Sequence, residues 1–139
     1  MPYEDDMGNT KVIYSLSPFC VKSVMADDRE VLPIHLSELV GYHGSTNGVP
    51  YKGARLFLIH VNRERTYHHV NRERTYHRWL LFDPTKKTAN VSAEFVFFEH
   101  SYIEFPVSLC VYGNRNSLYV SMGVNDEVAY ILEVAAPSF

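Results

Sequence analysis

The fold is decided by the stretch Ser101-Tyr-Ile-Glu-Phe-Pro-Val-Ser-Leu-Cys-Val-Tyr-Gly-Asn-Arg-Asn-Ser-Leu-Tyr-Val-Ser-Met-Gly-Val-Asn-Asp126, which contains two runs of alternating apolar and polar residues. Alternation with a period of two is typical of a strand that buries one face. In the first run the face predicted to be buried consists of Ile103, Phe105, Val107, Leu109 and Val111. In the second run it consists of Leu118, Val120 and Met122. The stretch therefore predicts an antiparallel hairpin with Glu104 near its start and Asp126 just after its end.

A turn and a third strand complete this unit. Gly113–Asn116 supplies residues that tolerate the left-handed backbone of a tight turn. After a second turn at 124–127, apolar residues alternate again at Val128, Tyr130, Leu132 and Val134. The last third of the chain is thus predicted to be a three-stranded antiparallel meander, followed by a short tail at 135–139.

Short apolar runs bounded by turn residues predict further strands upstream. They are expected at residues 11–16, 19–25, 55–59, 76–82 and 94–98, with 55–59 and 76–82 paired antiparallel. We expect a disordered segment at 1–10, a glycine-rich loop at 41–53, and either extended chain or one helical turn within 31–40. Because no segment shows sustained helical periodicity, the sequence predicts a single all-β domain over residues 11–134.

Length and composition limit the classes of function. The 139 residues, 46% of them hydrophobic, suit one globular domain, and a formal net charge of −3 gives no reason to expect nucleic acid or an anionic membrane as a partner. The first residues are acidic and lack the apolar core of a signal peptide, so a cytoplasmic location is expected. Cys20 and Cys110 have no metal or redox spacing and are expected to be buried free thiols.

One internal repeat interrupts the pair of strands at 55–59 and 76–82. His60-Val-Asn-Arg-Glu-Arg-Thr-Tyr-His68 is followed at once by the identical His69-Val-Asn-Arg-Glu-Arg-Thr-Tyr-His77. Nine residues are too few for a structural repeat unit, and neighbouring imidazoles on a strand point to opposite faces, so no metal site is expected. Nine is also odd, so the extra copy is predicted to bulge out as a longer loop rather than to extend the ladder.

The two acidic residues of the terminal meander each have two interpretations. An ionised Glu104 cannot be buried alone, so it either pairs with a cation such as Arg78 or faces a wet cleft. Asp126 either contacts a ligand or forms a turn with its own backbone.

Trp79, next to Leu80 and Leu81, is expected in the core rather than on a sugar-stacking surface. The sequence has no nucleophile elbow, phosphate loop or zinc spacing, and no cofactor is expected.

Several of these segments, in this order, resemble a known family. They are Arg55-Leu-Phe-Leu-Ile-His60, Arg74-Thr-Tyr-His-Arg-Trp-Leu-Leu-Phe-Asp83, Val91-Ser-Ala-Glu-Phe-Val-Phe97, Tyr102-Ile-Glu-Phe-Pro-Val-Ser-Leu109 and Leu118-Tyr-Val-Ser-Met-Gly-Val-Asn-Asp-Glu-Val-Ala129. They resemble the C-terminal blades of the five-bladed β-propellers of glycoside phosphorylases and hydrolases of the mannoside-phosphorylase type. Related propeller modules are fused to glycosyltransferases. The resemblance covers about residues 11–134.

The resemblance implies a role for five residues. Such propellers bind sugar in a central funnel, where Asp126 would accept hydrogen bonds from sugar hydroxyls and Glu104 would lie at the entrance. His60 would face the sugar or phosphate pocket, although the duplication lets His69 compete for that position. Arg78 would pair with Glu104 or contact an anionic group. Ser45 would lie in a loop that reaches the pocket.

The chain also departs from the family pattern. Tyr42-His43 replaces an arginine and Ser108-Leu109 replaces Gly-Leu, and the blades that carry the catalytic acid are missing. Five blades of about 40–50 residues need more than about 200 residues, so no catalytic residue is assigned and catalysis by this chain alone is not expected. The sequence predicts a carbohydrate-binding propeller fragment associated with glycosyl transfer or glycoside cleavage. A non-catalytic β interaction module and a truncated product without activity are the alternatives, and exposed blade edges predict self-association.

Overall fold

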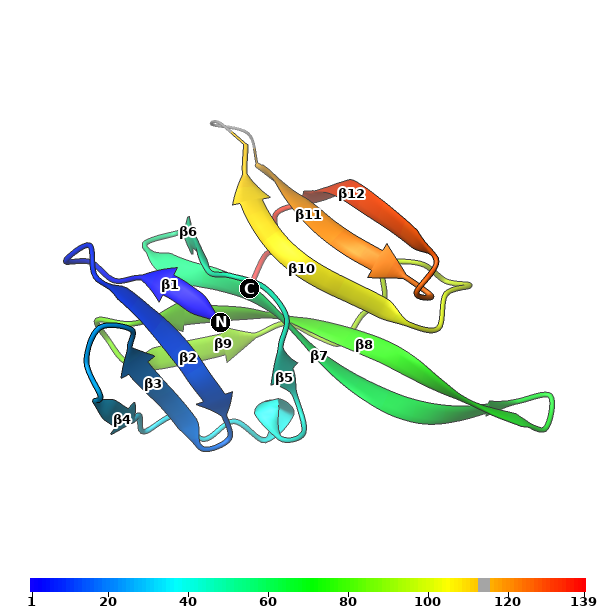
Figure 1. The fold of residues 1–139 in the computed structure, drawn as a ribbon, viewed down its shortest axis with the longest axis horizontal. Helices are drawn as coiled ribbons and strands as arrows, with labels where there is room; N and C mark the ends of the chain where they lie inside the picture. Colours follow the sequence, from blue (N-terminus) through cyan, green and yellow to red (C-terminus); the bar gives the residue numbers. More distant parts are fainter. Residues whose placement is uncertain (113–115) are drawn as a thin grey trace.

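The protein is an all-β chain of three antiparallel sheets, shown in Figure 1. The computed structural model describes residues 1–112 and 116–139. The first sheet, called here the N-terminal sheet, has the strand order β1-β2-β3-β4. Its strands are β1 (Pro2–Glu4), β2 (Thr10–Leu16), β3 (Phe19–Ser23) and β4 (Arg29–Val31). Of the two alternatives left open for residues 31–40, extended chain or one helical turn, the structure contains the turn, as the 3-10 helix η1 (Ser37–Leu39) that leads into the second sheet.

The second sheet, the central sheet, has the order β5-β7-β8-β9, with β6 also paired to β7. Its strands are β5 (His43–Gly44), β6 (Val49–Tyr51), β7 (Ala54–Tyr67), β8 (Val70–Asp83) and β9 (Thr88–Val91). The strand predicted at 94–98 is wrong, because only Phe95 bridges to β8 there. The amides of Phe97 and Phe98 bind the Glu104 carboxylate instead of a neighbouring strand.

The third sheet, the C-terminal sheet, is the predicted meander. It consists of β10 (Glu104–Val111), β11 (Ser117–Val124) and β12 (Val128–Ala135). The alternation predicted for β11 is confirmed, since Leu118, Val120 and Met122 are all buried. Most of the hairpin turn predicted at Gly113–Asn116 lies outside the described residues.

The buried face predicted for β10 is wrong except at Leu109. Phe105, Val107 and Val111 are exposed, whereas Glu104 and Pro106 are buried. The register to β11 shifts between Pro106 and Ser108, which marks a β-bulge. An extra residue on one strand exchanges the faces of every residue on one side of it, and the bulge therefore turns the start of β10 over.

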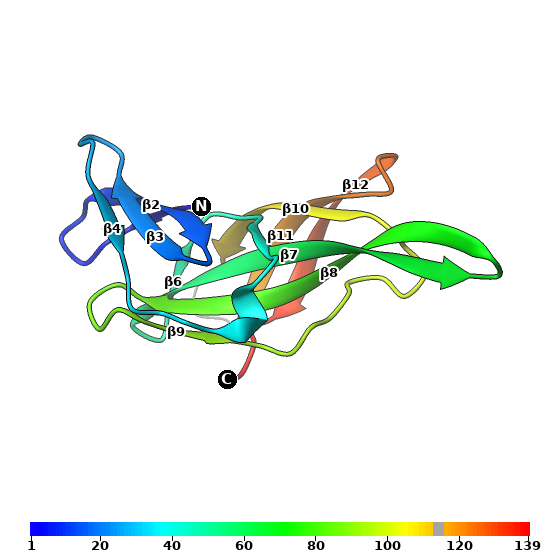
Figure 2. The ribbon, with the colours of Figure 1, turned by 90° about the horizontal axis from the view of Figure 1, so that it is seen from below.

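The N-terminal and C-terminal sheets pack against the two faces of the central sheet through separate cores, and Figures 1 and 2 show the three sheets from two directions. Leu56, Phe57, Leu58 and Ile59 of β7 are all completely buried. Phe57 and Ile59, with Leu80 and Phe82 of β8, form one core with the N-terminal sheet. Leu56 and Leu58, with Trp79, form a second core with the C-terminal sheet. Because neither face of this part of β7 meets water, the strand is apolar at consecutive positions rather than at alternate ones.

The nine-residue duplication is absorbed in the ladder, and the predicted bulging loop is therefore wrong. β7 and β8 pair without a break from Arg55 opposite Phe82 to Tyr67 opposite Val70, and His68 and His69 form the two-residue turn. Both turn residues have the positive φ, 48° and 63°, that a type I′ hairpin turn requires. Each strand carries one copy of the repeat. An odd insertion at a hairpin tip changes only the number of turn residues, so the register at the base is kept.

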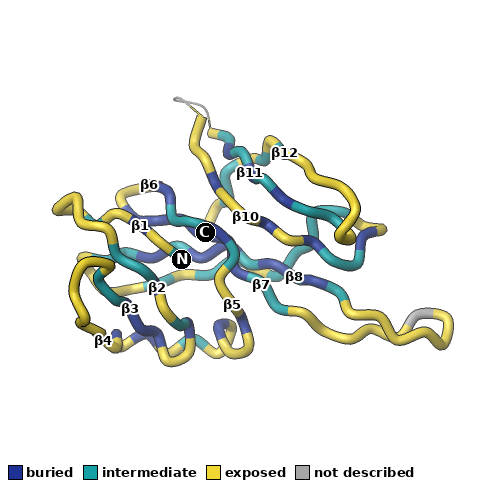
Figure 3. Tube along the Cα trace, viewed as in Figure 1, coloured by how far each residue is buried: buried dark blue, intermediate teal, exposed yellow. Residues whose placement is uncertain are grey.

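The outer half of this hairpin extends beyond all three sheets, and Figure 3 shows it as exposed along most of its length. We call it the arm, from Val61 to Tyr76. At the other end of the chain, the first ten residues, expected to be disordered, include strand β1. Tyr3 is buried in the core between the first two sheets, and Arg55 Nε donates to the Glu4 carbonyl at 2.6 Å. This inward-facing aromatic residue anchors the segment.

Two expectations remain, one about the two cysteines and one about membrane-spanning segments. Cys20 and Cys110 are both free thiols, but only Cys20 is buried and Cys110 is exposed on β10. In the part of the chain that the structure describes, no helix has the length and apolar character needed to span a membrane.

Candidate functional site

A cleft of about 600 Å³ is lined by residues of all three sheets, mainly by residues 13–17 of the N-terminal sheet and residues 41–47 around β5. Pro2 of β1, His43 of β5 and Val107 of β10 all line it. Its polar lining comes from Tyr14, Ser15, Ser17, His43, Ser45, Thr46 and Asn47. None of the described residues that line the cleft is Asp, Glu, Lys or Arg, and the α-ammonium group of Met1, which also lines it, donates to the Ile13 carbonyl at 3.0 Å. Because it is large enough for a small ligand and offers neutral hydrogen-bonding groups, this cleft is the candidate binding site.

Three histidines lie in one row across the central sheet, and the first of them, His43, lines this cleft. His43 is paired with His60, and His60 with His77, so their side chains share one face. The rings of His43 and His60 are 6.0 Å apart. Burial, followed by the proximity of His77 and His43, lowers the pKa of His60 below its ordinary value. The imidazole of His60 is therefore neutral at pH 7.

The structure brings together Ser45 and His60, two of the residues predicted to reach the pocket. Ser45 Oγ and His60 Nδ1 are joined by a hydrogen bond of 2.7 Å. The backbone amide of Ser45 also donates to the Leu58 carbonyl at 3.1 Å, which fixes the loop against β7. His69, the other copy of this histidine, lies at the tip of the arm. Hence His60, and not His69, is the histidine beside the loop.

A serine bonded to a histidine is the central pair of many nucleophilic sites, but such sites also need a third group to orient the base. Among the described residues no carboxylate makes a hydrogen bond or ion pair with His60. The neighbouring rings are those of His43 and Phe105. The hydrogen bond to His60 therefore fixes the orientation of the Ser45 hydroxyl, and Ser45 lines the cleft.

Asn47 fixes the wall of the cleft that faces the C-terminal sheet. Its Oδ1 accepts from the Leu109 amide at 3.0 Å, and its Nδ2 donates to the Leu109 carbonyl at 3.2 Å. The Asn47 amide thus bonds the N–H and C=O groups that a neighbouring strand would pair with, and it joins the loop after β5 to the free edge of β10. These two bonds fix β10, whose Val107 also lines the cleft, next to the loop after β5.

Glu104 is not in the cleft, and this corrects its predicted position at the funnel entrance. Its side chain is 1% exposed and accepts hydrogen bonds from His77 Nε2 at 2.9 Å and from the amides of Phe97 and Phe98 at 2.9 and 2.8 Å. The Ser101 hydroxyl donates a further bond. Burial by itself raises the pKa of Glu104, but the bonds from His77, Ser101 and the two amides outweigh it, so the pKa is lowered overall.

Arg78 does not pair with Glu104, so that prediction is wrong too. Neighbouring strand residues point to opposite faces, and His77 takes the position that faces Glu104. Arg78 Nη1 donates to the Ser92 carbonyl at 2.8 Å, and its guanidinium carbon lies 5.4 Å from the centre of the Tyr42 ring. Glu94 is the nearby anion: hydrogen bonds from Arg63 and Tyr42 lower its pKa to about 2 against the opposing effect of burial.

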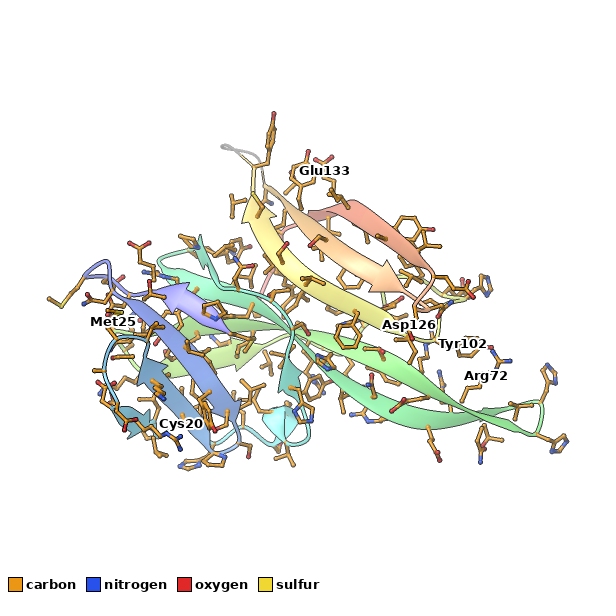
Figure 4. The ribbon with its side chains drawn as sticks, viewed as in Figure 1. Cys20, Met25, Arg72, Tyr102, Asp126 and Glu133 are labelled. Carbon is orange, nitrogen blue, oxygen red and sulfur yellow. The ribbon has the colours of Figure 1, made fainter. Side chains whose placement is uncertain are left out.

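Asp126 lies at another place on the surface. It occupies the turn between β11 and β12 with a φ of 56°, the left-handed conformation of a turn-former. Together with Arg72 and Tyr102 it lines a separate cavity of about 450 Å³, and Figure 4 shows these three residues near one another. The two carboxylates predicted to share a sugar cavity are therefore apart: one is enclosed in protein and the other borders the base of the arm.

Sequence reasoning missed most of the cleft. His43, Asn47 and Tyr14 were not selected. His43 lies on β5, which is only two residues long and shows no periodicity, Asn47 lies in the loop after it, and Tyr14 lies on a different sheet, in β2. The glycines and small polar residues of the 41–53 segment indicated a loop but not which side chains face inward. Among the described residues, no three His, Cys, Asp or Glu side chains gather closely enough to hold a metal ion.

The fold and the site define an all-β protein with a cleft that is lined from all three sheets and whose described lining has no Asp, Glu, Lys or Arg side chain. No protein-family model, curated protein or solved structure matches this chain. The function is therefore argued from the geometry and chemistry of the site.

Proposed function

We propose that this chain is a carbohydrate-binding module whose three sheets correspond to blades of a β-propeller. Each sheet is an antiparallel unit made from strands that are close in sequence, and the sheets follow one another in chain order. They also pack face to face through the two cores that flank β7. Stacked meanders of this kind are the unit from which propellers are assembled.

The observation that carries the proposal is the chemistry of the cleft. Its lining comes mainly from residues 13–17 of the N-terminal sheet and from residues 41–47 around β5, together with Pro2 of β1 and Val107 of β10, and none of the described side chains that line it is Asp, Glu, Lys or Arg. Hydroxyl, amide and imidazole groups can both donate and accept hydrogen bonds, as sugar hydroxyls require. Tyr14, which is 59% exposed, adds an aromatic ring for the apolar face of a sugar. A neutral saccharide is the ligand that fits these groups.

Saccharide binding is tested by calorimetric titration with mannosides and galactosides. We expect at least one neutral saccharide to bind, and His43→Ala and Ser45→Ala each to weaken binding by about 10-fold, equivalent to one lost hydrogen bond of about 1.4 kcal/mol. His35→Ala is the matched control, because His35 is exposed and does not line the cleft. Its affinity should equal that of the wild type.

A second variant distinguishes the cleft from the region of Asp126. Asp126→Ala should leave saccharide affinity unchanged if the ligand occupies the cleft. Loss of binding in Asp126→Ala together with normal binding in His43→Ala would move the site to the base of the arm and contradict the proposal. Absence of binding to every saccharide tested would contradict it as well.

The association with glycosyl transfer or glycoside cleavage remains part of this proposal. Glycosidic cleavage needs two carboxyl groups on either side of the scissile bond, and no described residue lining the cleft carries one. In this proposal the module holds a glycan, and the catalytic groups come from another polypeptide segment.

A second proposal concerns self-association through the free edge of the C-terminal sheet. β12 is the last strand of its sheet and exposes Val128, Tyr130 and Ile131, the last with 76% of its surface accessible. An eight-residue edge with unpaired backbone groups and exposed apolar side chains favours pairing with a second copy.

The test is the molar mass in solution over a range of concentrations, measured by light scattering after size exclusion. The wild type should form a dimer at high concentration, and Ile131→Lys should weaken the dimer by about 10-fold or more, because two charges would meet at the edge. Val40→Lys is the control, since Val40 is an exposed apolar residue outside this sheet. A wild type that stays monomeric at every concentration would rule out the interface.

A further inference from the structure

Four arginine side chains gather on one face of the arm, where their positive charges repel one another. Because the two copies of the repeat pair antiparallel, Arg63 lies opposite Arg74 and Arg65 lies opposite Arg72. All four side chains therefore share one face of the ribbon. Like charges directly opposite each other destabilise a pair of strands, so this face favours any group that brings negative charge to it.

Part of this charge is satisfied within the protein. Arg63 is paired with Glu94, with Nη2 and Oε1 separated by 2.7 Å. The guanidinium carbon of Arg72 lies 4.6 Å from the centre of the Tyr102 ring. Such ion pairs and cation–π contacts reduce the repulsion for these two side chains.

The other two arginines retain unused donors. Arg65 makes no hydrogen bond or ion pair with the side chains and backbone that the structure describes. Arg74 donates through Nη2 to the carbonyls of Glu99 and Phe98 at 3.0 and 3.4 Å. Its Nε is buried and has no partner among the described residues. A buried donor without a partner is costly, and the Nη1 group of Arg74 makes no hydrogen bond with the described residues, so it can donate to a ligand.

Both arginines line one cavity of about 530 Å³ between the arm and the 98–102 segment. The remaining lining includes His100 and Tyr102, which offer ring groups, and Glu99, the one acidic residue of the described lining. Two guanidinium groups against one carboxylate leave the cavity positive. Arg65 and Arg74 occupy diagonal positions of the ladder, where side chains are about 7–8 Å apart at the backbone and both reach a common point.

We propose that this cavity binds a tetrahedral oxyanion, phosphate or sulfate, held by the guanidinium groups of Arg65 and Arg74. Guanidinium groups match such oxyanions in geometry and charge, through paired N–H donors in a planar fork. The site is separate from the neutral cleft and does not depend on saccharide binding there. It gives the duplicated segment a binding function of its own.

The probes are inorganic phosphate and inorganic sulfate, titrated calorimetrically at an ionic strength kept constant with sodium chloride. We expect saturable binding that Arg65→Gln and Arg74→Gln each weaken at least 10-fold, and that Arg65→Lys restores in part because the charge returns. Arg29→Gln is the matched control: it removes an equal charge from a guanidinium that also lies over a tyrosine ring, Tyr14, on the N-terminal sheet. Its affinity should match the wild type.

Glucose 6-phosphate, compared with glucose, distinguishes the sources of the oxyanion. Equal affinity for inorganic phosphate and the ester identifies the free ion as the ligand, whereas at least 10-fold tighter binding of the ester identifies a phosphorylated larger molecule. Absence of saturable binding to both inorganic ions would overturn the proposal, as would equal weakening in Arg29→Gln. A single-stranded oligonucleotide that binds while phosphate does not, and that all the arginine variants weaken equally, would also overturn it in favour of dispersed charge attraction.

Discussion

Replacing Glu104 with glutamine is expected to lower the free energy of unfolding by about 3–5 kcal/mol, the range for breaking a buried, hydrogen-bonded charge arrangement. The carboxylate receives four hydrogen bonds, from His77, Ser101 and the amides of Phe97 and Phe98. Glutamine keeps one acceptor oxygen and places an NH₂ group where the other carboxylate oxygen accepts from the Phe98 amide and the Ser101 hydroxyl. The Ser101 hydroxyl can turn to the Phe98 carbonyl at 3.1 Å, but the Phe98 amide loses its acceptor and meets another donor in a buried site.

This arrangement also explains how the 92–103 segment is held. The segment contains one β-bridge residue, Phe95, and its loop amides converge on the Glu104 carboxylate where a strand would otherwise satisfy them. The backbone amide of Glu104 donates to Thr75 Oγ1 at 3.2 Å, and this hydrogen bond connects β10 to β8. In the Gln variant we therefore expect faster amide hydrogen exchange at Phe97 and Phe98 before exchange rises elsewhere.

Urea denaturation followed by circular dichroism measures the change. Glu127→Gln is the matched control, because Glu127 is exposed in the turn after β11, and it should change stability by less than about 0.5 kcal/mol. A Glu104→Gln variant as stable as this control would show that the carboxylate charge is not required and that the four hydrogen bonds are of little net value.

Replacing Trp79 with alanine should lower the free energy of unfolding by a similar amount, about 3–5 kcal/mol, the usual range for removal of a large buried aromatic side chain. Trp79 is 7% exposed, as predicted for a core position, and belongs to the core between the central and C-terminal sheets. Its ring stacks on Phe95 with centroids 5.9 Å apart and an interplanar angle of 20°. Its removal leaves a cavity between two layers that cannot easily collapse, because β7 is packed on both faces.

The same denaturation experiment tests this prediction, with two comparisons. Trp79→Phe keeps an aromatic ring against Phe95 and should lose only about 1–2 kcal/mol. Phe139→Ala removes an aromatic side chain that is 47% exposed and should change stability by less than about 0.5 kcal/mol. Near-wild-type stability of Trp79→Ala would mean that the C-terminal sheet is not held by this core.

The sequence predicted the strands better than the faces that they bury. The alternation in β11 is regular and its burial follows directly, but in β10 a bulge after Pro106 exchanges the two faces. A bulge adds no composition signal that would reveal its place. The apolar run at 55–59 marked a buried strand correctly. Its burial on both sides depends on two other sheets, which a single run cannot show.

The site was harder to predict because it depends on which strand ends meet. Ser45 and His60 were both selected, and the pairing of β5 with β7 brings them within 2.7 Å. The partner of Glu104 was missed by one position: alternation requires that either His77 or Arg78 faces β10, but it does not say which. Asn47 was missed entirely, because an amide that bonds to a distant backbone follows no sequence pattern.

The even division of the repeat between two strands makes the reach of the arm adjustable. An in-frame loss or gain of one nonapeptide would change the arm by about four to five residue pairs, or about 15 Å at the usual rise of a strand. The buried pairs at its base, from Arg55 opposite Phe82 to Ile59 opposite Arg78, would keep their partners. Slippage during replication of a perfect tandem copy could thus produce relatives with shorter or longer projections on an unaltered body, and natural selection would act on reach separately from folding.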